Sequence, residues 1–169
     1  TILILDDEPS ILESLRPYFE DIGYTVFTAE DGQKGLDIFL RESIAVVLTD
    51  LRMPRKNGFE VMEAVHEHRP ETQVIVVSGV DRNQELIQAL RMGAKDYIIK
   101  PVMDLEMIGH AVNRAFDNYR LLMDNQRYRR ALEKSEHYYR TITENIAEGV
   151  FVVDNNQKFT YVNQAFCTM

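Results

Sequence analysis

The amino-acid sequence predicts an α/β fold in which a parallel sheet is covered by helices on both faces. Two observations support this class and show how far along the chain it extends. Five short apolar runs alternate with four longer amphipathic stretches over the first hundred residues, and such alternation is typical of parallel sheets with right-handed crossovers. After residue 104 the pattern changes to one long helix and then to a hairpin-like segment.

The local pattern gives the expected elements in order. The apolar runs predict strands at residues 2–5, 25–28, 45–49, 73–77 and 96–99. Between them, apolar side chains at spacings of three and four predict helices at residues 10–21, 32–41, 58–68 and 83–92. Pro9 falls in the first turn of a predicted helix, and Gly23 and Gly93 follow predicted helix ends.

Residues 104–146 contain no proline and a single glycine, Gly109, which predicts one long helix. Its side chains follow steps of four and three in two series, Ile108, Val112, Ala115, Tyr119 and Leu122, and then Tyr128, Leu132, Ser135, Tyr139, Ile142 and Ile146. The series differ in register, so we expect a discontinuity near residues 121–127. We expect a linker that forms a parallel coiled coil in a dimer. The alternative is a helix that packs its first half on the sheet and leaves its second half in solvent.

The last segment is expected to be a hairpin. Residues 150–154 and 158–163 are strand-like and flank a polar turn. A two-stranded hairpin alone is marginally stable, so we expect this segment to open a truncated domain. The chain begins at Thr1 without a methionine or an apolar leader, so we also expect a processed or excised piece rather than a secreted precursor.

Composition and charge are those of a globular protein. Hydrophobic residues make up 45% and charged residues 27% of the 169 residues, and the formal net charge is −8. Residues 1–103 hold 11 basic and 18 acidic side chains, which favours cationic ligands over nucleic acid. Cys167 is the one cysteine, which suits a reducing compartment. No apolar run approaches the roughly 18–20 residues that span a bilayer, so we expect a cytoplasmic protein that binds neither nucleic acid nor membrane.

Polar side chains follow four of the predicted strands. Asp6 and Asp7 follow the first, Asp50 the third, Ser78 the fourth and Lys100 the fifth. Parallel sheets place ligand sites at the carboxyl ends of their strands, so these side chains should converge. Crowded carboxylates favour a hard divalent cation such as Mg²⁺. The set predicts phosphoryl transfer, with Asp50 as the nucleophile, the first two acids as metal ligands and Lys100 as the balancing cation.

Four stretches resemble the receiver domain of two-component response regulators. They are ILILDDEP ending at Pro9, VLTDLRMPRKNG around Asp50, VVSG around Ser78 and GAKDYIIKP ending at Pro101. The resemblance covers residues 1 to about 120. It implies a flavodoxin-like sheet with strand order 2-1-3-4-5 and a cis peptide bond between Lys100 and Pro101. It also implies a histidine kinase or a phosphotransfer protein as the phosphoryl donor.

The same resemblance implies how the acids act. Asp50 would be the phosphoacceptor, and Mg²⁺ (or Mn²⁺) would be held by Asp6, Asp7, Asp50 and the backbone carbonyl of Arg52. The protein would accept and lose the phosphoryl group by its own chemistry and would not be a turnover enzyme.

The resemblance also implies a switch. Ser78 would hydrogen-bond the phosphoryl group, Lys100 would pair with it, and the Tyr97 ring would turn toward the core. Arg52 and Val80 occupy positions that influence the lifetime of the acyl phosphate in the family. The long side chain of Arg52 would either shield the phosphoryl group from water or point to solvent.

The stretch ALEKSEHYYRTITENIAEGVFVVDNNQKFTYVNQAF resembles the signalling helix and first hairpin of a PAS sensor domain. We therefore expect a receiver domain at residues 1–120, a helical linker at 104–146 and the truncated start of a PAS domain at 147–169. The output face would comprise residues 83–92, 96–99 and 104–120. It would relay the signal through the linker to a PAS-containing effector, and a homodimer would form through that face or through the linker.

Two other functions compete with this interpretation. A Mg²⁺-dependent phosphatase with an aspartyl nucleophile needs a D-x-D pattern after the first strand, whereas Asp6, Asp7 and Glu8 follow it here. A degenerate receiver used only for protein binding normally lacks an essential Asp or Lys, and none is missing. A phosphorylation-controlled receiver therefore agrees best with the sequence.

Overall fold

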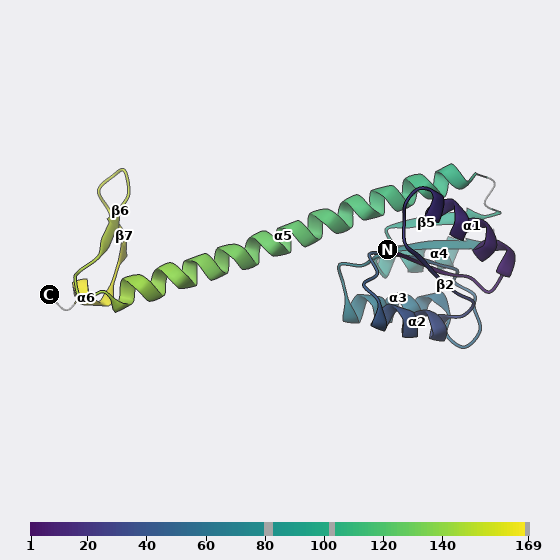
Figure 1. Ribbon diagram of the computed structural model, residues 1–169, viewed down its shortest axis with the longest axis horizontal. Coiled ribbons are helices and arrows are strands. Elements are labelled where there is room, and N and C mark those ends of the chain that lie inside the picture. Colours follow the sequence, from purple (N-terminus) through teal and green to yellow (C-terminus); the bar gives the residue numbers. More distant parts are fainter. Residues whose placement is uncertain (80–82, 102–103, 168–169) are drawn as a thin grey trace. The chain divides into compact units, whose positions relative to one another are not determined.

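The computed structural model describes residues 1–79, 83–101 and 104–167. Within them, helices surround a five-stranded parallel sheet, and a two-stranded antiparallel sheet follows the longest helix (Figure 1). The strands of the large sheet are β1 (Ile2–Leu5), β2 (Val26–Ala29), β3 (Val46–Thr49), β4 (Gln73–Gly79) and β5 (Asp96–Lys100). The helices between and after them are α1 (Pro9–Asp21), α2 (Gly32–Arg41), α3 (Gly58–His68), α4 (Asn83–Arg91) and α5 (Leu105–Asn145). The chain then forms β6 (Phe151–Val153), β7 (Phe159–Val162) and α6 (Gln164–Cys167).

The large sheet has the strand order β2-β1-β3-β4-β5 with every pair parallel. The predicted fold class and strand order are confirmed. β1 and β3 pair in register, so that Leu5 lies opposite Thr49. Because both strands end at this pair, the residues that follow them arrive at the same edge of the sheet.

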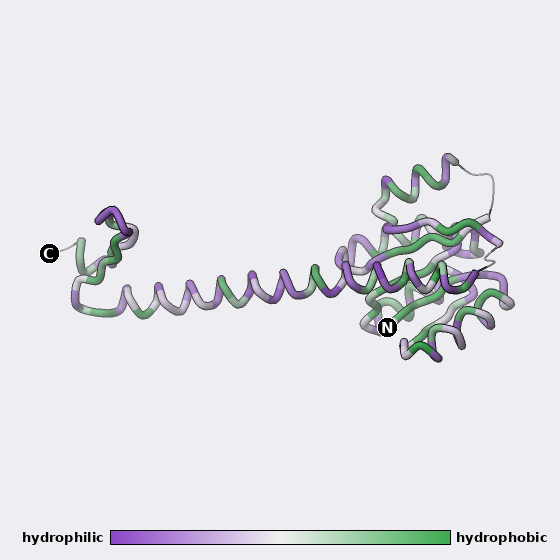
Figure 2. Tube along the Cα trace, turned by 90° about the horizontal axis from the view of Figure 1, so that it is seen from above, coloured by the Kyte–Doolittle hydropathy of each residue, from purple (hydrophilic) through white to green (hydrophobic). Residues whose placement is uncertain are grey.

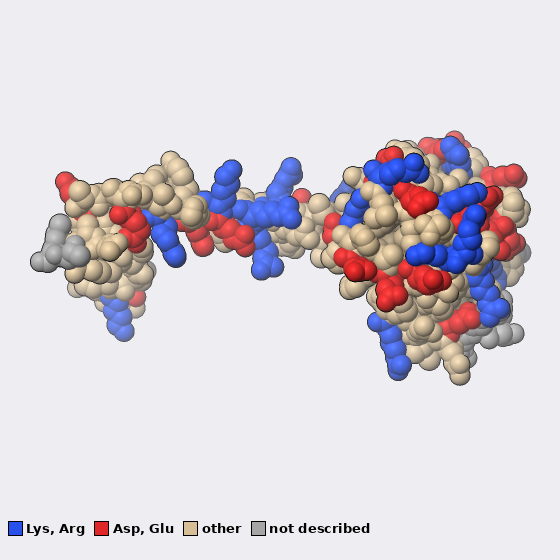
Figure 3. Space-filling view, turned by 90° about the horizontal axis from the view of Figure 1, so that it is seen from below, with Lys and Arg blue, Asp and Glu red and all other residues tan. Residues whose placement is uncertain are grey.

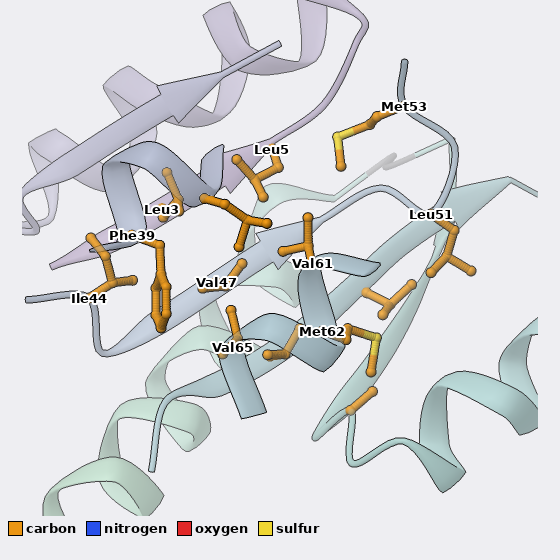
Figure 4. Close-up of a cluster of buried hydrophobic side chains, with 14 of the residues drawn as sticks. Leu3, Leu5, Phe39, Ile44, Val47, Leu51, Met53, Val61, Met62 and Val65 are labelled. Carbon is orange, nitrogen blue, oxygen red and sulfur yellow. The ribbon is translucent and has the colours of Figure 1, made fainter. Parts of the chain in front are cut away.

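Successive side chains of a strand point to opposite faces of the sheet. Both faces of this sheet are buried, because helices cover each of them. On one face, Leu3, Leu5 and Val47 pack with side chains of α2, α3 and α4 (Figure 4). On the other face, Ile2 and Ile4 pack with side chains of α1 and of the first part of α5. Charged side chains of both signs are spread over the outer surface (Figure 3).

Helix α5 has two environments along its length. Ile108, Val112 and Ala115 are at most 2% exposed and belong to the core, so the first predicted series packs on the sheet as far as Ala115, whereas Leu122 at its end is 41% exposed. Farther along, Leu132 is 61% and Tyr139 64% exposed, and polar and apolar residues are mixed along this part of the helix (Figure 2). The change falls where the chain divides into two compact units, residues 1–123 and 124–169. Residues 121–127, where we predict the discontinuity in register, span this boundary.

The second unit is built on the end of α5. β6 and β7 pair antiparallel, which confirms the predicted hairpin. The fully buried side chain of Asn163 donates to the carbonyls of Thr143 and Glu148 at 2.9 and 3.0 Å. It accepts from the backbone N–H groups of Val150 and Phe166 at 2.8 and 3.0 Å. These bonds hold the hairpin against the C-terminal end of α5.

Among the described helices, none has the length and apolar character needed to cross a membrane.

Candidate functional site

The site is built from residues that directly follow β1 and β3. The N–H of Asp50 donates to the carbonyl of Leu5 at 2.9 Å, which continues the pairing of the two strands past their ends. Asp6 and Asp50 are therefore neighbours, and their exposed fractions are only 2% and 7%. Asp7 is exposed at the same edge. The sheet register, rather than any local motif, brings these acids together.

Lys100 arrives at the same edge from the end of β5. Its Nζ lies 2.8 Å from Asp6 Oδ2, 2.8 Å from Asp50 Oδ2 and 3.0 Å from Glu8 Oε1. The Lys100–Pro101 peptide bond is cis. Burial alone would lower the pKa of the Lys100 ammonium, but the hydrogen bonds to these carboxylates outweigh burial and raise that pKa. Lys100 is thus a fixed positive charge beside Asp50.

The three acids form a set of oxygen donors suited to a divalent cation. One carboxylate oxygen from each of Asp6, Asp7 and Asp50 lies within 4.8 Å of the others. Burial raises the pKa of the Asp6 carboxyl, and the hydrogen bond from Lys100 opposes this rise without cancelling it. Mg²⁺ prefers hard oxygen ligands such as carboxylates, so the residues present fit this ion.

The loop between β3 and α3 folds back over Asp50. The N–H of Arg52 donates to Asp50 Oδ1 at 3.2 Å, and the N–H of Gly58 donates to the carbonyl of Leu51 at 3.0 Å. A β-carbon on Gly58 would lie 2.3 Å from the carbonyl oxygen of Asp50, so only glycine allows this approach. Asn57 then starts α3 with a reciprocal capping box. The backbone of Arg52 is therefore held against the phosphoacceptor candidate.

Ser78 and Tyr97 lie on the adjacent strands β4 and β5. Ser78 is 2% exposed. Burial raises the pKa of the Tyr97 phenol, and the nearby Ser78 side chain opposes that rise. The two predicted switch residues therefore lie near each other.

The Arg52 side chain is expected either to shield the phosphoryl group or to point to solvent. It is exposed, and it also forms an ion pair that neither expectation includes. It is 65% exposed, and its Nη2 lies 3.2 Å from Glu85 Oε1 on α4. The pair borders an open hollow of about 440 Å³ that is also lined by Leu51, Met53, Asn57 and Phe59. Val80, the other residue expected to influence the phosphoryl lifetime, lies outside the described residues.

Two acids of this region were missed by reasoning from the sequence. Glu8 contacts Lys100, and its position directly after Asp7 was a usable signal. Glu85 contacts Arg52 from 33 residues away, and no spacing in the sequence indicates that contact.

Comparison with known proteins identifies the family. The family model described as the response regulator receiver domain matches residues 2–113. This chain belongs to the response regulator receiver family. A PAS domain model matches residues 137–169. The receiver therefore occupies the first unit, and the PAS match covers the end of α5 and the hairpin.

Relatives and solved structures agree with this assignment. The transcriptional regulatory protein DltR of Streptococcus agalactiae is 35% identical over 100 residues, which are 59% of this chain and 45% of that protein. The regulator of RpoS from Escherichia coli is 32% identical over 111 residues, 66% of this chain and 33% of that protein. This chain thus spans less than half the length of these relatives. The crystal structure of a receiver domain protein from Clostridium thermocellum has a TM-score of 0.67 and 34% identity, over 72% of this chain and 97% of that one.

Membership in the family carries several general properties. Receiver domains of two-component systems take a phosphodonor kinase as partner, typically use Mg²⁺ and are generally not turnover enzymes. The acid cluster of this receiver is consistent with that use of a metal.

Proposed function

We propose that this receiver accepts a phosphoryl group on Asp50 in a Mg²⁺-dependent reaction and uses it to change the surface around α4, β5 and α5. The observation that carries the proposal is the buried Asp50 carboxylate, which has Lys100 Nζ at 2.8 Å and the Arg52 N–H at 3.2 Å on its two oxygens. A carboxylate held between fixed donors is a positioned nucleophile.

In the proposed reaction an Asp50 oxygen forms a bond to phosphorus while the bond from phosphorus to the donor breaks. The donor is a phosphohistidine of a histidine kinase or a phosphotransfer protein, and its imidazole leaves. Lys100 stays in place and balances the charge that develops on the phosphoryl oxygens. Bound Mg²⁺ would neutralise charge on those oxygens, and Asp6, Asp7, Asp50 and the carbonyl of Arg52 would hold it. Loss of the phosphoryl group to water returns the free carboxylate and resets the switch, and in this proposal the protein acts as a phosphoacceptor rather than as a turnover enzyme.

The position of Ser78 near Tyr97 on the adjacent strands β4 and β5 supports the proposed readout. A phosphoryl group on Asp50 offers the Ser78 hydroxyl a charged acceptor, and charged acceptors form the stronger hydrogen bonds. When Ser78 turns toward it, the surroundings of the nearby Tyr97 phenol change and the ring takes a new position. A shift of this kind changes the balance of two existing states rather than creating a new one.

The domain organisation follows from the same proposal. Residues 1–120 act as the receiver, residues 104–146 as the helical linker and residues 147–169 as the start of a PAS domain in an effector. The apolar side chains exposed on the second half of α5, among them Leu132 and Ile142, are the surface for a parallel homodimer. The proposed location is the cytoplasm, where two-component kinases deliver their phosphoryl groups.

The proposal is tested by intact-protein mass spectrometry after incubation with acetyl phosphate. With Mg²⁺ the wild-type protein should gain the mass of one phosphoryl group, and with a chelator it should gain none. The Asp50→Asn variant should gain none in either condition, whereas Asp21→Asn, an exposed acid at the end of α1, should behave as wild type. A wild-type protein that gains no mass under any condition would leave the competing interpretation, a phosphorylation-independent binding module.

A further inference from the structure

An ion pair outside the acid cluster connects α2 to the loop that follows Asp50. Asp31 lies two residues after the end of β2 and is fully buried. Its Oδ1 accepts from the N–H of Lys34 at 2.8 Å and so caps α2. Its Oδ2 pairs with the guanidinium of Arg55, whose side chain is 56% exposed. The cap needs only one oxygen, so the pair with Arg55 is a separate interaction.

Arg55 lies at the bend of the loop. Its φ is +67°, in the left-handed region that side chains other than glycine, asparagine and aspartate rarely adopt. The next residue rests on α2, because a β-carbon on Gly32 would lie 2.2 Å from the carbonyl oxygen of Lys56. The loop is thus held at its middle by α2 and at its start by the bond from the Arg52 N–H to Asp50.

We propose that Asp31 and Arg55 are positioning residues for the metal site. Their ion pair fixes the loop that carries Arg52, and thereby places the Arg52 backbone beside the three acids. The inference rests on the proposed function, because it assumes that Asp6, Asp7, Asp50 and Arg52 hold a divalent cation. Neither residue of the pair touches that cation itself.

For the Arg55→Asn variant, electrostatics and loss of positioning predict changes in metal affinity of opposite sign. Arg55→Asn removes a positive charge near a cation site, and the loss of that repulsion should strengthen metal binding slightly. Loss of positioning should weaken it, and residues that orient metal ligands typically contribute about 10- to 100-fold to affinity. The sign of the change therefore separates the two effects. Asparagine also tolerates a positive φ, so the substitution does not force the loop to refold.

The test is a direct binding titration with Mn²⁺, followed by electron paramagnetic resonance of the free ion. Arg55→Asn should raise the Kd for Mn²⁺ by about tenfold, and Arg55→Lys should recover part of the loss. Asp31→Asn keeps an oxygen for the cap and should also weaken binding. The double variant should be no weaker than the worse single variant, because the two residues act through each other. Lys56→Asn makes the same change one residue away and should leave the Kd within about twofold of wild type.

Thermal unfolding of each variant without metal shows whether the fold is intact. An unchanged or lower Kd in a folded Arg55→Asn protein would overturn the inference, as would additive losses in the double variant. Absence of Mn²⁺ binding in the wild type would overturn both the inference and the proposed metal site. A wild type that binds Mn²⁺ but gains no phosphoryl group would overturn the proposed function alone, and the variants would still test the positioning.

Discussion

The Arg52 guanidinium on the loop after β3 pairs with the Glu85 carboxylate on α4, with Nη2 and Oε1 3.2 Å apart. The contact joins the segment that carries Asp50 to a helix of the proposed output face. A phosphoryl group on Asp50 would compete with Glu85 for Arg52, because both are anions within reach of the same loop. The pair therefore links the charge at the site to the position of α4.

Removing the charge of Glu85 should lengthen the life of the aspartyl phosphate. In Glu85→Gln the Arg52 side chain loses its charged partner and is held less strongly, so it can cover the phosphoryl group against water more often. An exposed pair of this kind is worth about 0.2–1 kcal/mol, so the rate of phosphoryl loss should fall by about 1.4- to 5-fold. Decay is followed on phosphate-affinity gels after the donor is removed. Glu63→Gln, an exposed acid on α3, is the control, and equal decay in both variants would contradict the role of the pair.

Tyr18 of α1 occupies the space beside Gly109 of α5 in which a side chain at residue 109 would lie. A β-carbon on Gly109 would lie 2.5 Å from the Tyr18 hydroxyl oxygen but 3.4 Å from the nearest ring carbon. Gly109→Ala should therefore destabilise the wild type. In a Tyr18→Phe background it should stabilise by up to about 1 kcal/mol, the intrinsic preference of helices for alanine over glycine. Urea unfolding of the four proteins measures this cycle, and the same sign of effect in both backgrounds would contradict the explanation.

The two halves of α5 should respond differently to truncation. Ile108 is fully buried, and Ile108→Ala should lower the free energy of unfolding of the receiver unit by about 2–5 kcal/mol. Ile142 is 42% exposed, and Ile142→Ala should change that free energy by less than about 0.5 kcal/mol. It should instead weaken self-association, which sedimentation equilibrium measures. Unchanged association of Ile142→Ala would argue against the second series as a dimer interface.

The pKa of Lys100 gives a stability prediction with a definite sign. A cation whose pKa is raised by folding stabilises the native state fully below its unfolded pKa, and the stabilisation is lost as pH rises toward the folded pKa. The ordinary value is 10.5, and the folded value is higher. The difference in unfolding free energy between wild type and Lys100→Gln should thus stay constant from about pH 6 to 9 and shrink above about pH 10.5. A difference that already shrinks near neutral pH would contradict the contacts of Lys100.

The sequence was sufficient for the fold and for the convergence of the acids. Continuous apolar runs and their alternation with amphipathic stretches follow from burial of the sheet on both faces. The meeting of Asp6, Asp50 and Lys100 follows from where parallel strands end. The two registers of α5 also have a physical origin, because Ile108 packs against the sheet of its own chain whereas Leu132 remains exposed.

Contacts that depend on the path of a loop could not be predicted. Arg55 reaches Asp31 only because the loop turns through a positive φ at this arginine. Arginine rarely adopts a positive φ, so the residue type would have predicted a different backbone conformation. Arg52 meets Glu85 only because α4 lies beside the loop in the folded chain. Periodicity and strand ends carry no information about such contacts.

Among the three neighbouring acids, Asp50 is the one proposed to take the phosphoryl group. Borohydride reduces an aspartyl phosphate to homoserine, so peptide mapping after treatment with acetyl phosphate, Mg²⁺ and borohydride reads out the modified position. We predict homoserine at residue 50 and aspartate unchanged at residues 6 and 7. Homoserine at residue 6 or 7, or at none of the three in a protein that has gained a phosphoryl group, would contradict it.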